Sequence, residues 1–367
     1  MSTENLAARF FLGCNTPQGF VSRFDQLGNI EENWRCFILK GGPGTGKSTL
    51  LKKTAEFFGK IGQNMELIPC SSDPDSLDAV ILKDCKICIA DGTSPHVLEP
   101  GYPALFETIV NLFDFMDADR LQPYKEELLK LSAAQKDLHT RCCRFLSAAA
   151  NLLNDTYRNA LEYTDAMKIK KYAKGLAAKE FPKKDKKNAT ESIRFLSAVT
   201  PFGVMVLKDT VSQLCEKVYL IDDEWGASGR ILLNSLKDYA LENHLDVISC
   251  YCPLFPYDKL EHLIIPELRL GFITASKYAP FELEGSRTIH AKRFMDMESF
   301  KKKKQRISFN RKAASELIAQ ASEFMKEARS LHNRQEYLYQ NCIDREGINE
   351  LTEKLLKELV RLSVRFE

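Results

Sequence analysis

The chain's richest chemical feature is a glycine-rich turn near the N-terminus that ends in a lysine and two hydroxyl residues. It fits the pattern G-x-x-x-x-G-K-[ST] and consists of Gly41, Gly42, Pro43, Gly44, Thr45, Gly46, Lys47, Ser48 and Thr49. Glycines allow a turn whose backbone N–H groups surround a phosphate, and the positive end of a following helix favours the same anion. Lys47 would then reach the β- and γ-phosphates, and the Ser48 hydroxyl would ligate Mg²⁺. The pattern predicts a nucleotide phosphate site with ATP and Mg²⁺ as cofactors.

The elements that must position this turn are also recognisable. Residues 36–39 form an apolar run typical of a strand, and residues 50–58 have a helix-like pattern. A second apolar stretch, residues 86–90, ends in Asp91, whose carboxylate could hold the Mg²⁺ that bridges the phosphates. We therefore expect Lys47 and Asp91 to be catalytic, with Ser48 and Asp91 as metal ligands. The structural alternative for Asp91 is an ordinary turn residue after a strand.

With these two motifs the chain resembles the P-loop NTPase superfamily, and residues 43–49 are similar to the corresponding core of AAA-type ATPases. The resemblance implies Mg²⁺-dependent ATP hydrolysis. Gly92, and not an acid, follows Asp91, so the catalytic glutamate usual in AAA-type ATPases is missing. The chain has no Asn-Lys-x-Asp for guanine recognition and no Leu-Ser-Gly-Gly signature of transporter ATPases.

The sequence contains the same pattern twice. Four segments recur at offsets of 184, 182, 183 and 179: residues 16–19, 37–39, 77–81 and 115–117 match residues 200–203, 219–221, 260–264 and 294–296. A near-constant offset over a hundred residues indicates tandem duplication. In this respect the chain resembles a bacterial family of duplicated P-loop ATPases.

The two copies differ at the phosphate turn. At an offset of 182 the counterparts of Gly46, Lys47 and Ser48 are Ser228, Gly229 and Arg230. At an offset of 183, Thr274 replaces Asp91. Residues 222–224 would add three carboxylates where phosphates should lie, and these would repel an anion. We expect one working nucleotide site in the first half and a degenerate one in the second. The alternative is that the second half never bound nucleotide.

Two further groups of polar residues occur only in the first half. Asp73 and Asp75 follow the end of a predicted strand, where open α/β sheets bind ligands. Either could hold a water on Mg²⁺ or accept a proton, and we count Asp73 among the catalytic candidates. The alternative is a polar turn that caps a helix beginning near Ser76. His96 could contact phosphate or base, or be a solvated loop histidine.

Composition describes an ordinary globular protein of 367 residues that is 44% hydrophobic and 28% charged. No apolar run reaches the roughly 20 residues that span a bilayer, and residues 1–6 lack the features of a secretory signal. The eleven cysteines show no disulfide framework, so we expect reduced thiols and a cytoplasmic location. Cys85 and Cys88 are interpreted as buried strand residues, because no second pair follows at zinc spacing.

The net charge of +2 conceals two basic segments. Residues 168–187 contain nine lysines and two acids, and residues 299–312 contain seven basic residues and no acid. Such segments could contact nucleic acid. Solvated helix faces are the commoner explanation, so nucleic acid is not the favoured partner.

The predicted fold is α/β, with two tandem P-loop NTPase-like cores that have parallel sheets, each followed by a long helical hairpin. In the first core, strands are expected near residues 10–12, 36–39, 65–69 and 86–90. Apolar spacings of three and four over residues 128–152 and 314–338 predict long helices, and second helices near 156–174 and 349–364 should return against them. The predicted ranges are 1–118 for the active core, 119–190 for its hairpin and a basic linker at 181–187, 191–297 for the degenerate core and 298–367 for the last hairpin.

The leading functional hypothesis is a Mg²⁺-dependent ATPase that acts as a nucleotide-driven switch, with the helical hairpins reporting its state to a protein partner. One alternative is a P-loop kinase for a small molecule or nucleotide. Such a kinase needs charge-stabilising arginines, and the sequence does not place them. Another alternative is a non-enzymatic ATP-bound scaffold that contacts nucleic acid or protein through its basic segments.

Overall fold

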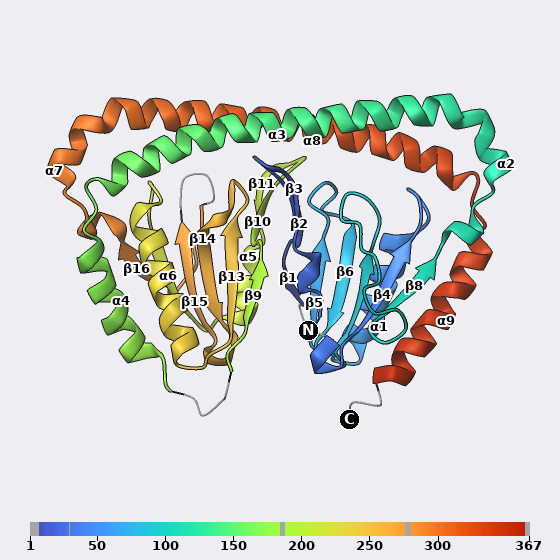
Figure 1. Cartoon of the computed structure of the whole chain (residues 1–367), viewed down its shortest axis with the longest axis horizontal. Helices are drawn as coiled ribbons and strands as arrows, with labels where there is room; N and C mark the ends of the chain where they lie inside the picture. The colour runs from blue at the N-terminus through green and yellow to red at the C-terminus, as the bar shows by residue number, and fades with distance from the viewer. Residues whose placement is uncertain (1–6, 29, 184–187, 276–279, 364–367) are drawn as a thin grey trace. The chain divides into compact units, whose positions relative to one another are not determined.

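The computed structural model describes residues 7–28, 30–183, 188–275 and 280–363 (Figure 1). The chain divides into two compact units. The first unit comprises Met1–Cys14, Ser22–Arg141 and Glu323–Glu367, and the second comprises Asn15–Val21 and Cys142–Ser322. Each unit therefore combines segments from both halves of the sequence.

The first unit contains a six-stranded sheet in the order β1-β5-β6-β7-β4-β8. The strands are β1 Ala8–Arg9, β4 Arg35–Lys40, β5 Met65–Pro69, β6 Leu77–Leu82, β7 Ile87–Asp91 and β8 Glu107–Asn111. β4 pairs in parallel with β7 and with β8. The strands expected near residues 36–39, 65–69 and 86–90 are confirmed. The buried stretch at residues 10–12 lies between β1 and β2 Gly13–Thr16.

The sheet is mixed, and the expectation of a parallel sheet is wrong at β6. This strand is antiparallel to both β5 and β7. Its connections to them are only residues 70–76 and 83–86, whereas a parallel crossover needs a dozen or more residues. The helix expected to begin near Ser76 is also wrong, since every residue of β6 is buried and the run is rich in strand-forming apolar side chains.

The second unit repeats this topology with the order β16-β12-β15-β14-β13-β9. Its strands are β9 Glu191–Arg194, β12 Lys217–Asp222, β13 Val247–Cys252, β14 Phe255–Ile265, β15 Leu270–Ala275 and β16 Arg287–His290. The registers match as well: Leu39 pairs with Asp91, and Ile221 pairs with Thr274. The internal repeat thus corresponds to two similar α/β cores, and Thr274 does stand where the first core has Asp91.

The repeated Thr-Pro-x-Gly segments form tight turns. The hairpins are β2 with β3 Gly19–Ser22, and β10 Ser197–Thr200 with β11 Gly203–Val206. The Thr16 hydroxyl donates to the carbonyl of Gly19 at 2.8 Å, and the Thr200 hydroxyl donates to that of Gly203 at 2.9 Å. Both glycines have positive φ, at 103° and 96°. This motif is therefore structural in both copies.

One face of each sheet is covered by two helices. In the first unit these are α1 Lys47–Lys60 and α9 Arg345–Ser363, and in the second α6 Ala227–Glu242 and α4 Ala166–Glu180. Leu51, Phe58 and Leu359 bury their side chains against Phe37 and Leu39 of β4. Full burial of side chains of this size contributes about 1.5–3 kcal/mol each. The C-terminal helix, red in Figure 1, is thus part of the first unit's core.

Each of two long helices begins in one unit and ends in the other. They are α3 Lys125–Leu161 and α8 Lys304–Gln340, each of 37 residues and therefore about 55 Å long. The remaining short helices are α2 Ala118–Leu121, α5 Lys208–Leu214 and α7 Met297–Phe300, and the 3-10 turns are η1 Phe24–Gln26, η2 Ile30–Glu32, η3 Phe113–Phe115, η4 Gln122–Tyr124, η5 Pro266–Leu268, η6 Ala291–Phe294 and η7 Lys301–Lys303.

The short helix that follows each long helix packs on the core of the other half of the sequence. α4 belongs to the second unit and α9 to the first. The expectation that these helices return against the long helix of their own half is therefore wrong. The physical reason is length, because a helix of about 55 Å carries the chain well away from the core that precedes it.

The repeated Phe-Met-Asp segments hold these short helices in place. In the first unit the Asp117 N–H donates to the carbonyl of Cys342, and the Asp344 N–H donates to that of Phe115, each at 2.8 Å. In the second unit the other copy of the segment bonds the turn before α4 in the same way. The duplicated motif therefore anchors a helix from the opposite half of the chain.

The basic segment at residues 168–187 lies partly on α4. Its lysines 168, 170, 171, 174 and 179 are exposed, while Ile169, Ala173 and Leu176 are buried against the core. These lysines form the solvated face of an amphipathic helix. Residues 184–187 of the predicted linker, residue 364 of the predicted last helix and residues 1–6 lie outside the described residues.

All eleven cysteines are free thiols. Cys85 and Cys88 are buried, as interpreted. Cys88 lies on β7, but Cys85 lies in the turn between β6 and β7, so its placement in a strand is wrong. Among the helices of the described residues, none is long and apolar enough to cross a membrane.

Candidate nucleotide-binding site

The glycine-rich turn lies between β4 and α1, as the sequence predicts. Gly44 and Gly46 have φ angles of 72° and 79°, and Gly46 is the residue that caps the start of α1. The first N–H groups of α1, beginning at Lys47, have no acceptor within the helix. The local structure is therefore strand, turn and helix, with N–H groups and a helix dipole directed to one point.

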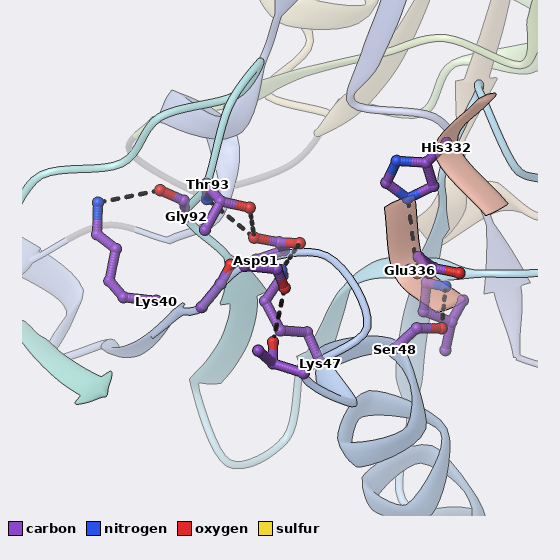
Figure 2. A network of polar contacts seen from close by, with 12 residues as sticks. Lys40, Lys47, Ser48, Asp91, Gly92, Thr93, His332 and Glu336 are labelled. Atoms are coloured by element: carbon purple, nitrogen blue, oxygen red, sulfur yellow. Dashed lines mark hydrogen bonds and ion pairs between the residues drawn. The ribbon is translucent and has the colours of Figure 1, made fainter. Parts of the chain in front are cut away.

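Lys47 and Asp91 meet next to this turn (Figure 2). The Lys47 Nζ donates to the carbonyls of Gly41 at 2.7 Å and Gly42 at 3.0 Å, and lies 3.6 Å from Asp91 Oδ2. Asp91 Oδ1 accepts hydrogen bonds from the backbone and hydroxyl of Thr93, at 2.9 and 2.6 Å. The structure thus brings together two predicted site residues, one at the start of α1 and one at the end of β7.

Ser48 connects the turn to β6. Its hydroxyl oxygen accepts the N–H of Leu77 at 3.0 Å, which places it beside the start of that strand. The next residue is Asp78, which is only 7% exposed. Ala79 pairs with Ala90 in the antiparallel ladder. Asp78, one residue before Ala79, therefore lies opposite Asp91, the last residue of β7. Asp78 is the acid that sequence reasoning missed.

Burial raises the pKa of Asp78 to about 6, and the Asp91 carboxylate acts in the same direction. His96 and Lys47 oppose this rise. The signal in the sequence was an acid inside an apolar run, repeated in the second half as Glu261. A hydroxyl and two carboxylates, all hard oxygen donors, gather near Lys47. These are the ligand types that Mg²⁺ prefers, so the residues fit the predicted ion.

Helix α8 packs directly on the turn. A Cβ added at Gly44 would lie 2.9 Å from the carbonyl oxygen of Glu336. The Glu336 carboxylate lies 3.5 Å from His332, and its pKa is lowered by that histidine, by the Gly44 N–H that it accepts and by Lys47. Figure 2 shows His332 and Glu336 on this helix. A carboxylate of the chain therefore lies beside the glycine-rich turn, where the Gly44 N–H favours its charged form.

Asp73 and Asp75 belong to a charged turn before β6. The Arg329 guanidinium on α8 lies 2.5 Å from Asp73 and 3.0 Å from Asp75. The Ser76 N–H donates to the Asp73 carbonyl, as in a turn, but a strand and not a helix follows. The Asp73 carboxylate is bonded to Arg329 and to the Ser76 hydroxyl, and its catalytic role stays a prediction.

His96 is not a solvated loop residue. It is 5% exposed, and its ring stacks on Phe24 with centroids 4.5 Å apart. Its charge acts on Asp78, which places it near the acids of the site. The expectation of solvent exposure is wrong because sequence patterns do not reveal which loop folds back over the sheet edge.

The structure explains why no glutamate follows Asp91. A Cβ at Gly92 would lie 2.3 Å from the Cγ2 of Ile38, a buried residue of β4. Any side chain at position 92 would collide with Ile38, so β4 and the end of β7 would have to move apart. The residue pattern usual in AAA-type ATPases is therefore sterically excluded here.

The corresponding turn of the second unit is two residues shorter, at 223–226 against 41–46. Gly226 caps α6 with a φ of 75°, as Gly46 caps α1 with 79°. The counterparts of Lys47 and Ser48 are therefore Ala227 and Ser228. The alignment at an offset of 182, which gave Gly229 and Arg230, is wrong at this turn because the shortening occurs before the helix.

An internal carboxylate occupies the N–H groups of this shorter turn. Asp223 is 2% exposed and accepts N–H bonds from Trp225 at 3.3 Å, Gly226 at 3.0 Å and Gly229 at 2.6 Å. Burial raises its pKa, and these N–H groups counteract the rise. The turn of the second unit is thus bonded to its own anion where a phosphate would bind.

Family models, curated proteins and solved structures were compared with this chain, and none of them matches it. The resemblance to P-loop NTPases, the cytoplasmic location and contact with nucleic acid stay predictions.

Proposed function

We propose that the first unit binds one Mg²⁺-bound ATP at the turn formed by residues 41–49 and hydrolyses it. The observation that carries this proposal is the position of Lys47, at the start of α1 and 3.6 Å from Asp91. A cation, a strand-end carboxylate and helix N–H groups converge there. These are the groups that stabilise transferring phosphates in P-loop enzymes.

Each residue has a defined task in this proposal. The turn's N–H groups and Lys47 bind the phosphates, and Ser48 and Asp91 hold the ion. Bound Mg²⁺ neutralises charge that develops on the phosphates. Asp78 accepts the proton of the attacking water, since a carboxyl whose pKa is about 6 is well matched to a base near neutral pH.

The contact of α8 with the turn supports the switch hypothesis. The Glu336 carboxylate lies near the Gly44 N–H, which a phosphate oxygen would also need. Nucleotide must therefore displace this carboxylate, and like charges favour its departure. Displacement of Glu336 would move the end of α8 and the start of α9. A protein partner that contacts these helices would sense whether nucleotide is bound.

Calorimetric titration with a Mg²⁺-bound, non-hydrolysable ATP analogue tests the proposal. We expect one site per chain, weakened when Mg²⁺ is chelated. Two sites would contradict the role assigned to Asp223, and an absence of binding would overturn the ATP hypothesis. Phosphate release without an acceptor then distinguishes hydrolysis from the kinase alternative, which requires one.

The Asp78→Asn variant should be more stable than the wild type at pH 8 by about 2–3 kcal/mol. The folded pKa of about 6 lies above an unfolded value near 3.9, and each pKa unit corresponds to about 1.4 kcal/mol. A raised carboxyl pKa leaves stability intact below about pH 4 and reduces it as the pH rises through 6. The gain of the variant should therefore grow over this range, as measured by denaturant unfolding.

The matched control is Asp238→Asn at an exposed position of α6, which should change the free energy of unfolding by no more than about 0.5 kcal/mol. The same Asp78→Asn variant should lose at least about tenfold in phosphate release, because the proposed base is removed. Greater stability with unchanged turnover would refute the catalytic role of Asp78 while leaving the nucleotide site intact.

A further inference from the structure

The second unit contains a cavity beside its shortened turn. The cavity measures about 80 Å³ and is bounded by the turn at 223–226, the first turn of α6, strand β14 and the end of α3. One water needs roughly 10–15 Å³ of such space, so the cavity has room for several waters or for one small organic group. Most of its lining is apolar, with a few charged side chains.

Arg230 is the charged group in this cavity that lacks a counter-ion. Its guanidinium stacks 4.0 Å from the ring centre of Tyr157 and 4.8 Å from that of Phe255. Its Nε is buried without a hydrogen-bond partner, and among the described residues no acid or other acceptor bonds its guanidinium. A guanidinium stays charged at any ordinary pH, and leaving its donors unsatisfied is costly.

The acids that line the cavity have partners of their own. Glu261 is 2.7 Å from Lys259, and Glu224 is 2.5 Å from Arg311. Asp223 accepts three backbone N–H groups. Among the described side chains of this cavity, the charged group left without a hydrogen-bond partner is therefore the Arg230 guanidinium, and the ligand complementary to it is an anion.

A lysine also lies near the turn of this unit, but on a different element. Ala227 replaces Lys47 on the helix, but Lys259 reaches the turn from β14, and a Cβ added at Gly226 would lie 3.8 Å from its Cε. The cation near this turn is thus supplied by β14 and not by the helix. The N–H groups that would bind phosphate donate to Asp223. These N–H groups are therefore not free to bind a triphosphate, but Lys259 and Arg230 still place positive charge beside the turn.

We propose that this cavity binds a small organic anion, a carboxylate or a phosphate monoester on a flat apolar body, with its charge on Arg230. The rings of Trp225, Tyr157 and Phe255 supply flat apolar walls for the body of the ligand. The planar guanidinium, held in place by two rings, can donate two parallel hydrogen bonds to either kind of anion. This site is independent of nucleotide binding in the first unit.

Fluorescence titration of Trp225 tests the proposal directly. The chain has two tryptophans, so Trp34→Phe leaves Trp225 as the sole reporter. Lys47→Ala in the same protein weakens anion binding at the first unit. Benzoate and phenyl phosphate are the probes, with neutral benzamide as an isosteric control. We expect a saturable change with at least one anion, and at least tenfold weaker binding of benzamide. The tighter of the two anions identifies the headgroup.

Arg230→Met should weaken the bound anion at least tenfold. Arg293→Met is the matched control, because Arg293 also stacks on aromatic rings of the second unit, 5.0 Å from Tyr172, but does not line the cavity. Should Arg230→Met fail to fold, Arg230→Gln provides the same test with less loss of polarity. Saturation by neither anion, equal binding of benzamide, or unchanged affinity in the Arg230 variant would each overturn the proposal.

Discussion

Replacing Lys47 by alanine should weaken binding of the Mg²⁺-bound ATP analogue at least about 100-fold. The ammonium group would lie between the phosphates and Asp91, where it forms charge-assisted hydrogen bonds. Two such bonds contribute about 3 kcal/mol, which corresponds to a factor of about 100 in the dissociation constant. Titration calorimetry at fixed ionic strength measures this change.

The loss should be one of binding and not of folding. Lys47 bonds only the carbonyls of its own turn and lies 3.6 Å from Asp91, which keeps its bonds to Thr93. We expect the variant to stay folded, with the free energy of unfolding lowered by about 1–3 kcal/mol, because the half-buried Asp91 loses a cation 3.6 Å away but keeps its bonds to Thr93. Lys60→Ala is the control on the same helix, since Lys60 is exposed and pairs with Glu56 at 2.6 Å. Equal affinities in the wild type and Lys47→Ala would refute the proposed site.

The strand, turn and helix around residues 41–49 were predictable because the pattern that specifies them is local. Residues 41–49 need particular residue types at fixed spacing, and the flanking strand and helix follow from apolar patterns on either side. The pairing of Lys47 with Asp91 was also predictable, because parallel strands place their carboxyl ends at one sheet edge. The lack of a lysine at the corresponding turn of the second half was visible in the sequence alone, although the alignment there was displaced by two residues. That this turn is a degenerate nucleotide site stays a prediction.

The structural features that were missed depend on contacts between distant segments. Glu336 is almost 300 residues from Gly44 in the chain, and nothing in its surroundings marks it as a neighbour of the turn. Asp78 lies in a run of apolar residues that fits a helix or a strand, and only the antiparallel pairing of β6 brings it to Asp91. The exchange of α4 and α9 was hidden for the same reason, since periodicity identifies a helix but not the core that it covers.

A comparison of the two units shows how a duplicated site can change its charge pattern. In the first unit, Asp78 is a buried acid near Asp91, and burial raises its pKa to about 6. In the second, its counterpart Glu261 is paired with Lys259 at 2.7 Å. The first unit therefore keeps two acids close together, whereas the buried acid of the second unit has a counter-ion within its own unit.

The Lys259→Met variant should be destabilised by about 3–5 kcal/mol at pH 7, because it leaves Glu261 buried without a counter-ion. Burial alone would raise the pKa of Glu261, but Lys259 holds it at about 2. A lowered carboxyl pKa contributes stability above the unfolded value near 4.3, and this contribution is lost as the pH falls through 2. In the variant the pKa of Glu261 should rise instead, so the difference from the wild type should shrink as the pH falls from 7 towards 4.

Denaturant unfolding of the double variant Lys259→Met/Glu261→Leu distinguishes charge from packing. Replacing both partners by apolar groups of similar size removes the unpaired charge, and most of the lost stability should return. Lys237→Met is the matched single control, because its partner Glu191 is 26% exposed and solvent screens the pair. Its cost should be about 1 kcal/mol or less. A Lys259→Met protein as stable as the wild type, or a double variant no more stable than the single one, would show that the pair does not compensate the charge of Glu261.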